Sequence, residues 1–170
     1  MPFRIETDAF EDGGIVPFRH SCFGANVQPG FRFLDAPDRT ASFAILFHDI
    51  DVALDGRTED GLHWVVWNVP ASAGGIPEGK LPEGTVTGRN VEGRNAFLGP
   101  GAPPGTRFHH YVFEVFALDS LLDLPSTASR DELLAAMEGK VLDKAAYVGR
   151  FKRPPESGRT PSSANPGPTP

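Results

Sequence analysis

Ionisable side chains gather where three apolar runs of the chain begin or end. They are Asp49 and Asp51 after residues 41–47, His63 before residues 64–69, and His109, His110 and Tyr111 at the start of the run that ends at Leu118. An imidazole N–H and a phenol hydroxyl both donate hydrogen bonds to phosphate oxygens. A carboxylate can accept from the second ring nitrogen and so fix the tautomer of a histidine. This combination of residue types indicates a site for an anion.

The arrangement of the carboxylates and of a glycine-rich loop refines this hypothesis. A carboxylate that faced the anion would repel it, so we expect Asp49 to orient a histidine rather than to contact the ligand. Asp51 can equally belong to a solvated acidic turn. Backbone N–H groups at Gly99 and Gly101 would add donors. They lie in a long segment, residues 70–107, for which we predict no regular structure and therefore a functional loop.

Two other interpretations of the same residues stay open. Two histidines and one carboxylate, here His63, His109 and Asp49, can form a facial triad for a transition metal, which would indicate a metal-dependent hydrolase. The histidines can also be structural residues that are hydrogen-bonded inside the fold. A nucleophilic enzyme is not indicated, because Ser21 lacks the G-x-S-x-G turn, and the sequence contains no phosphate-binding loop and no dinucleotide fingerprint.

The charge balance excludes several classes of protein. The chain carries 22 acidic and 16 basic side chains, a formal net charge of -6, so neither nucleic acid nor an anionic bilayer would attract it. No apolar run approaches the roughly 20 residues of a membrane-spanning helix, and acids interrupt the start of the chain where a signal peptide would be apolar. The single Cys22 excludes an internal disulfide and a thiolate zinc cage. We expect a soluble, cytoplasmic protein without a cofactor.

The elements that must position these side chains are mostly strands. Strong strand patterns, rich in β-branched and aromatic residues, cover 41–47, 64–69 and 111–118, and weaker ones cover 3–7, 31–34 and 147–151. One helix is predicted after Ser129, where Glu132 completes a capping box. Leu133, Leu134, Met137 and Val141 follow it at helical spacing, and Gly139 is a candidate end of its first part. The pattern predicts a mainly β sandwich with one or two peripheral helices.

The chain divides into two parts by composition. Residues 1–153 show no repeat and no internal linker, so we expect a single domain. Residues 154–170 are rich in proline and serine and almost free of apolar side chains. Because such a segment cannot bury enough surface to offset the entropy of ordering, we expect a flexible tail.

Several motifs, in this order along residues 8–152, resemble the phosphatidylethanolamine-binding proteins, and more narrowly the bacterial Raf kinase inhibitor-like branch. They are FEDGG at 10–14, NVQP at 26–29, SFA at 42–44 leading into Asp49-x-Asp51, HWVVWNVP at 63–70, the segment from Gly99-Pro100 to Pro104-Gly105, His109-x-Tyr111, and ELLAAMEGKVLDKAAYVGRF at 132–151. The resemblance implies a large antiparallel sheet packed on a smaller one, with helices at the edge and a small anion pocket near one end.

The resemblance also implies a function and a set of pocket residues. It implies a non-enzymatic binding protein for phosphate-like anions or phosphorylated head groups, which can dock onto and inhibit a kinase or a protease, and a homodimer is an option. The pocket residues implied by motif position are Asp49, Asp51, His63, Gly99, Gly101, His109 and Tyr111. We expect His63 and His109 to be the main donors to the ligand.

This sequence departs from the family pattern at the rim of the implied pocket. Ile50 and Ala53 replace two prolines of the D-P-D-x-P element, and His48 replaces the acid that usually precedes it. His110 replaces an arginine. We expect a looser, less acidic entrance, and we expect His48 and His110 to have solvent-facing or structural roles, since strand alternation puts His110 on the face opposite His109 and Tyr111.

Overall fold

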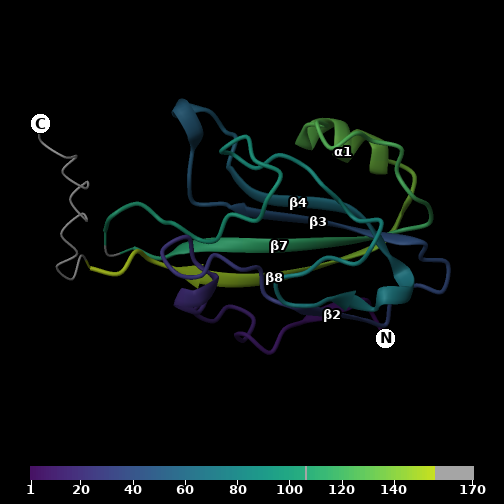
Figure 1. The fold of residues 1–170 in the computed structure, drawn as a ribbon, viewed down its shortest axis with the longest axis horizontal. Helices are drawn as coiled ribbons and strands as arrows, with labels where there is room; N and C mark the ends of the chain where they lie inside the picture. The colour runs from purple at the N-terminus through teal and green to yellow at the C-terminus, as the bar shows by residue number, and fades with distance from the viewer. Residues whose placement is uncertain (106, 156–170) are drawn as a thin grey trace, which may run out of the picture.

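The computed structural model describes residues 1–105 and 107–155 as two antiparallel sheets with a single α-helix among these residues (Figure 1). The smaller sheet has the strand order β1-β2-β5, and the larger one the order β6-β4-β3-β7-β8. The strands are β1 (Arg4–Glu6), β2 (Phe31–Leu34), β3 (Ser42–Asp49), β4 (Gly61–Pro70), β5 (Gly75–Ile76), β6 (Val86–Thr87), β7 (His109–Leu118) and β8 (Val141–Phe151). The predicted mainly β sandwich is confirmed.

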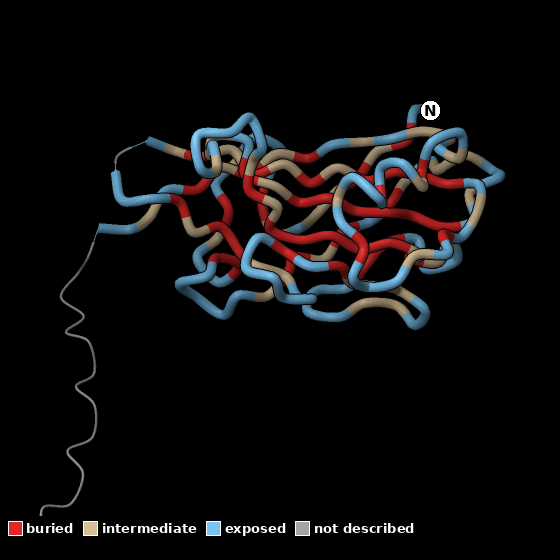
Figure 2. Tube along the Cα trace, turned by 90° about the horizontal axis from the view of Figure 1, so that it is seen from above, coloured by how far each residue is buried: buried red, intermediate tan, exposed pale blue. Residues whose placement is uncertain are grey.

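The core lies between the two sheets and is dominated by aromatic side chains. Phe31 and Phe33 from β2 meet Phe43, Phe47 and other inward side chains of the larger sheet. Inward residues alternate with outward ones, as the two-residue period of a strand requires. Figure 2 shows the result: the central strands are buried, and the exposed residues are concentrated in the loops. This rigid core holds the strand ends from which the site is built.

The outer face of the larger sheet is covered by the helix α1 (Arg130–Met137) and the segment before it. Leu133 and Met137 pack there against a second apolar cluster that includes Trp67. The predicted capping box is confirmed: the Ser129 hydroxyl accepts from the backbone N–H of Glu132, and the Glu132 carboxylate accepts from that of Ser129. The helix therefore begins where the sequence pattern places it.

The end of this helix corrects one expectation. Val141 was expected to continue the helical spacing, but the chain turns at Gly139, whose φ is 75°, and Val141 opens β8 opposite Leu118. A left-handed glycine ends the helix, and pairing with β7 then outweighs any helical preference of the residues that follow. The strand β8 is thus six residues longer at its start than the predicted strand at 147–151.

The segment 70–107 is also more regular than predicted. It contains the strand β5, which pairs with β2, and the strand β6, which pairs with β4. Three 3-10 turns complete the regular elements among the described residues, namely η1 (Phe18–His20), η2 (Leu54–Gly56) and η3 (Ala71–Ala73). Two-residue strands have no periodicity of their own, so the sequence pattern could not reveal them.

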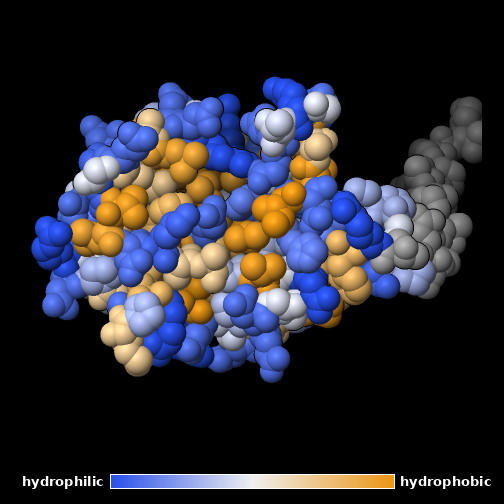
Figure 3. All heavy atoms as spheres, turned by 180° about the vertical axis from the view of Figure 1, so that it is seen from behind, coloured by the Kyte–Doolittle hydropathy of each residue, from blue (hydrophilic) through white to orange (hydrophobic). Residues whose placement is uncertain are grey.

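The remaining expectations concern the ends and the surface of the chain. Of the predicted tail at 154–170, all but Pro154 and Pro155 lies outside the described residues. Within the described residues, each helix is too short or too polar to cross a bilayer. On the face shown in Figure 3, apolar side chains form several patches between hydrophilic ones.

Candidate functional site

A β-bulge sets the direction of His63. Phe47 of β3 pairs with Trp64, but the next residue, His48, pairs with Leu62, so His63 is the extra residue on β4. Trp64 packs into the core between the sheets, whereas Leu62 packs on the outer face. Because of the extra residue, His63 lies on the inner side together with Trp64 rather than opposite to it. Bulges commonly re-aim side chains in this way near functional sites.

His63 lines a cavity of about 260 Å³ at the end of the larger sheet. Five of the seven predicted pocket residues line this cavity, and they are Asp49, His63, Gly99, Gly101 and Tyr111. The other lining residues are Cys22, Val52, Leu54, Gly61, Val91, Glu92, Leu98, Ala102 and Pro103. Three neighbouring strands, β3, β4 and β7, thus deliver one ionisable side chain each to the same small space.

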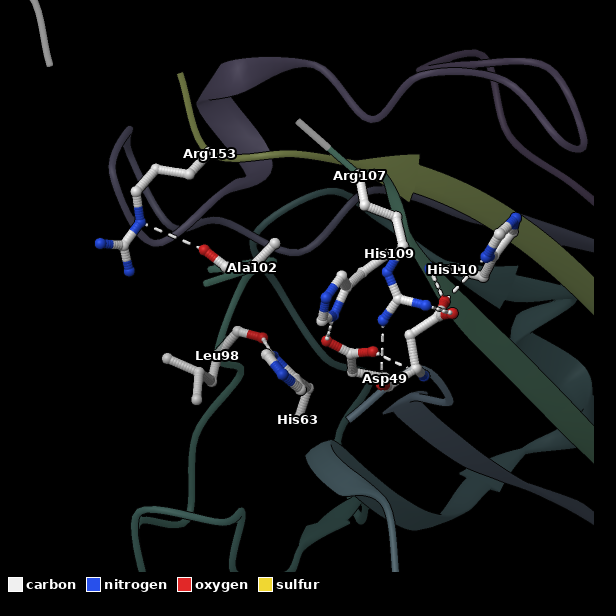
Figure 4. A network of polar contacts seen from close by, with 9 residues as sticks. Asp49, His63, Leu98, Ala102, Arg107, His109, His110 and Arg153 are labelled. Carbon is white, nitrogen blue, oxygen red and sulfur yellow. Dashed lines mark hydrogen bonds and ion pairs between the residues drawn. The ribbon is translucent and has the colours of Figure 1, made fainter. Parts of the chain in front are cut away.

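The carboxylate of Asp49 contacts two neighbouring residues through hydrogen bonds. Its Oδ2 atom lies 2.7 Å from Nδ1 of His109, and its Oδ1 atom accepts a 2.9 Å hydrogen bond from the backbone N–H of Asp51 (Figure 4). Both Asp49 and His109 are buried. His109 is not one of the side chains that line the cavity. Its role as a direct donor to a ligand therefore stays a prediction, and its observed contact is with Asp49.

His63 has a defined tautomer in its neutral form. Its Nδ1 atom lies 2.9 Å from the carbonyl oxygen of Leu98, which can only accept, so Nδ1 must carry the proton. Burial lowers the pKa of His63, and this effect outweighs the opposite influence of the Leu98 and Gly99 carbonyls and of the Asp49 carboxylate. The neutral ring therefore keeps a lone pair on Nε2.

Tyr111 is fully buried and lines the cavity, and its hydroxyl makes no hydrogen bond of normal geometry among the described residues, although the Asp49 carboxylate lies nearby. Burial raises the pKa of Tyr111 well above its usual range, and the nearby Asp49 carboxylate adds to the effect. The backbone N–H groups of Gly101 and Ala102 act on this pKa in the opposite direction but do not offset the effect of burial. A buried hydroxyl without a partner is costly and usually has a functional explanation.

Close packing against residues 20–26 fixes the loop that carries the two glycines. A Cβ atom on Gly99 would lie 2.1 Å from the carbonyl oxygen of His20, and one on Gly101 would lie 2.7 Å from Sγ of Cys22. The backbone N–H of Gly99 donates to Oδ1 of Asn26 over 2.7 Å. Cys22 and Asn26 have no signal in the sequence that marks them as part of the site, except that Asn26 belongs to the NVQP motif.

Asp51, His48 and His110 lie outside the cavity lining, as His109 does. Asp51 accepts from the backbone N–H of His110, lies 2.8 Å from its Nδ1 atom, and is 3.4 Å from Arg107. Burial raises the pKa of Asp51, but the hydrogen bonds from His110 and the charge of Arg107 outweigh it and hold this pKa below its usual range. His48 lies between Asp60, at 2.6 Å, and Glu114, at 3.1 Å.

A larger cavity, of about 450 Å³, lies at the rim of the smaller sheet. Its two arginines are already paired: Arg19 contacts Glu78, and Arg32 lies 2.8 Å from Asp8. The smaller cavity holds the unpartnered hydroxyl and the residues predicted from the sequence. We therefore take the smaller one as the candidate site in spite of its size.

The metal-dependent alternative needs three ligands around one point. Among the described residues, no three or more His, Cys, Asp or Glu side chains are placed to hold a metal ion. His109 approaches the cavity only through Asp49, whose two carboxylate oxygens are engaged. The geometry therefore does not assemble the facial triad that this hypothesis requires.

Comparison with known proteins agrees with this architecture. The family model described as phosphatidylethanolamine-binding protein matches residues 6–152. A UPF0098 protein of Methanothermobacter thermautotrophicus is 37% identical over 155 residues, covering 88% of this chain and 99% of the relative. A UPF0098 protein of Pyrococcus horikoshii is 35% identical and is matched over 78% of its length, with 90% of this chain covered.

Two solved structures have a similar fold. The crystal structure of YbcL from Escherichia coli, described as a new member of the mammalian PEBP family, has a TM-score of 0.82 and 28% identity. The match covers 91% of this chain and all of YbcL. A homologue from Chlamydia trachomatis has a TM-score of 0.82 and 27% identity, covering 90% of this chain and 99% of its own. With the two-sheet sandwich already described, these matches lead to one conclusion. The chain belongs to the phosphatidylethanolamine-binding protein family.

Proposed function

We propose that this protein is a non-enzymatic binding protein whose small cavity takes a phosphate-like anion or a phosphorylated head group. The observation that carries the proposal is the meeting of His63, Asp49 and the unpartnered hydroxyl of Tyr111 in one cavity. A buried donor without a partner indicates that a ligand group or an ordered water completes the site.

Backbone N–H groups of the cavity can donate to an anion in addition to the side chains. Gly101 and Ala102 line the cavity together with Tyr111, so their backbone N–H groups can add donors to an anion bound there. The charge of Asp49 is partly offset, because Asp49 accepts from His109 and from the backbone N–H of Asp51. This arrangement supports the role of Asp49 as a group that orients its neighbours. The docking to a kinase or protease and the homodimer stay predictions.

Calorimetric titration with inorganic phosphate and with phosphoethanolamine tests the proposal. The parent protein should bind at least one of the two, and the His63→Ala variant should bind it about tenfold more weakly, since a hydrogen bond to a charged ligand is lost. His110→Ala is the matched control, because this histidine lies at the same end of the molecule but outside the cavity lining. Equal affinities of the parent and the His63→Ala variant would exclude this site.

A further inference from the structure

We propose that the cavity selects the protonated, singly charged form of a phosphomonoester, whose P–OH group donates a hydrogen bond to Nε2 of His63. The inference rests on the proposed function and specifies the ligand of that site. It distinguishes a monoester, which can carry a proton on phosphorus-bound oxygen, from a diester, which cannot.

The His63 ring already makes one hydrogen bond within the protein. Since the Leu98 carbonyl occupies Nδ1–H, the neutral ring can offer only the lone pair of Nε2 to anything else. The His63 ring makes its hydrogen bond to Leu98 through Nδ1, which leaves the Nε2 lone pair to face a ligand. A fully deprotonated phosphate oxygen is an acceptor only, so its lone pairs would repel the lone pair of Nε2. A P–OH group would instead donate a hydrogen bond to Nε2.

Protonating the His63 ring, in place of the ligand, would be unfavourable in this environment. The ring is 9% exposed and packs edge-on against Tyr111, with centroids 5.2 Å apart, and against Phe47, at 5.7 Å. An aromatic, desolvated environment disfavours the imidazolium form, in agreement with the lowered pKa of His63. A proton that arrives on the ligand leaves the ring neutral and avoids this cost.

Besides His63, four titratable side chains line the cavity. Asp49 comes from β3, Tyr111 from β7, Glu92 from the segment between β6 and β7, and Cys22 from the packed segment at 20–26. Two of these four are carboxylates. Burial raises the pKa of the Cys22 thiol and outweighs the charge of Arg153, so the thiol stays neutral. Among the described residues no lysine or arginine side chain lines the cavity, and Arg153 reaches only its edge, where it donates a 3.1 Å hydrogen bond to the carbonyl of Ala102. The two carboxylates that line the cavity therefore favour a ligand with one negative charge over a ligand with two.

Methyl phosphate and dimethyl phosphate test this inference directly by calorimetry. The two probes differ by one methyl group, and at pH 6 about half of methyl phosphate is in the protonated form, since its second pKa is about 6. The parent protein should bind methyl phosphate about tenfold more tightly than dimethyl phosphate, because only the monoester can donate a hydrogen bond to Nε2 of His63. The affinity for methyl phosphate should fall as the pH rises from 6 to 8.

The same comparison of the two esters is repeated with the His63→Gln variant. A glutamine amide donates as well as accepts, so the preference for the monoester should fall to about threefold or less in this variant. Equal binding of the two esters by the parent would overturn the inference and leave the proposed function in place. Binding of neither ester would overturn both. The comparison on the parent protein needs no variant, so it holds even if the substitution impairs folding.

Discussion

Replacing Tyr111 by phenylalanine should change stability and ligand binding in opposite directions. The substitution removes only the hydroxyl, which is buried and has no hydrogen-bond partner among the described residues. In the free protein the group therefore carries a desolvation cost that is not offset by a hydrogen bond of normal geometry. In the proposed complex it would donate a hydrogen bond to the ligand. A residue retained for binding would show this trade-off, whereas a residue retained for packing would not.

The magnitudes follow from the state of the hydroxyl in each form. An unsatisfied buried polar group costs about 1–3 kcal/mol, so Tyr111→Phe should raise the free energy of unfolding by about 1 kcal/mol or leave it unchanged. A hydrogen bond to a charged group contributes about 1.5–3 kcal/mol, so the affinity for phosphate should fall by about 10-fold or more.

Tyr147→Phe is the matched control, because the Tyr147 hydroxyl donates a 2.6 Å hydrogen bond to the carbonyl of Phe10. Its loss should lower the free energy of unfolding by about 1 kcal/mol and leave phosphate binding unchanged. Urea unfolding and calorimetric titration of both variants provide the comparison. If Tyr111→Phe lost stability as Tyr147→Phe does and kept the parent affinity, the assignment of Tyr111 to the site would be refuted.

Two further substitutions test the structure around the site. Burial lowers the pKa of His48, but its hydrogen bonds to Glu114 and Asp60 raise it more, so the net shift is upward. The stability from these bonds is present below the unfolded pKa of about 6.5 and is lost as the pH rises through the folded value. His48→Gln should therefore be less stable than the parent by about 1–2 kcal/mol at pH 6, and urea unfolding should show this difference shrinking toward pH 9; a constant difference would contradict the pairing. Gly101→Ala should cost about 1–3 kcal/mol, because its Cβ would lie 2.7 Å from Sγ of Cys22, and adding Cys22→Ala should restore most of the stability in thermal unfolding. No recovery in the double variant would contradict that contact.

The sequence predicts the fold well where the signal is local or periodic, and five of the seven predicted pocket residues line the cavity. The aromatic and β-branched runs place the three central strands of the larger sheet, and the Ser129 capping box places the start of α1. The helix end was wrong, because the spacing that includes Val141 continues past a glycine with positive φ. Short strands such as β5 and β6 depend on partners far away in the sequence, which a local pattern does not encode.

The internal geometry of the site could not be predicted for a different reason. Strict alternation along β4 would place His63 opposite Trp64, and only the bulge, which depends on the pairing with β3, puts both on one side. The hydrogen bond from His63 to Leu98 spans 35 residues of chain, so no spacing rule reveals it. The tautomer of His63, on which the ligand preference depends, therefore becomes visible only in the folded protein.

The most direct test of a phosphate site at His63 is a histidine-resolved NMR titration with inorganic phosphate. We expect a saturable shift of the His63 ring resonances, no comparable shift at His48 on the outer face, and the loss of the shift in Tyr111→Phe at the same phosphate concentration. A His63 ring that does not respond to phosphate, or a response confined to His48 and His110, would contradict the account.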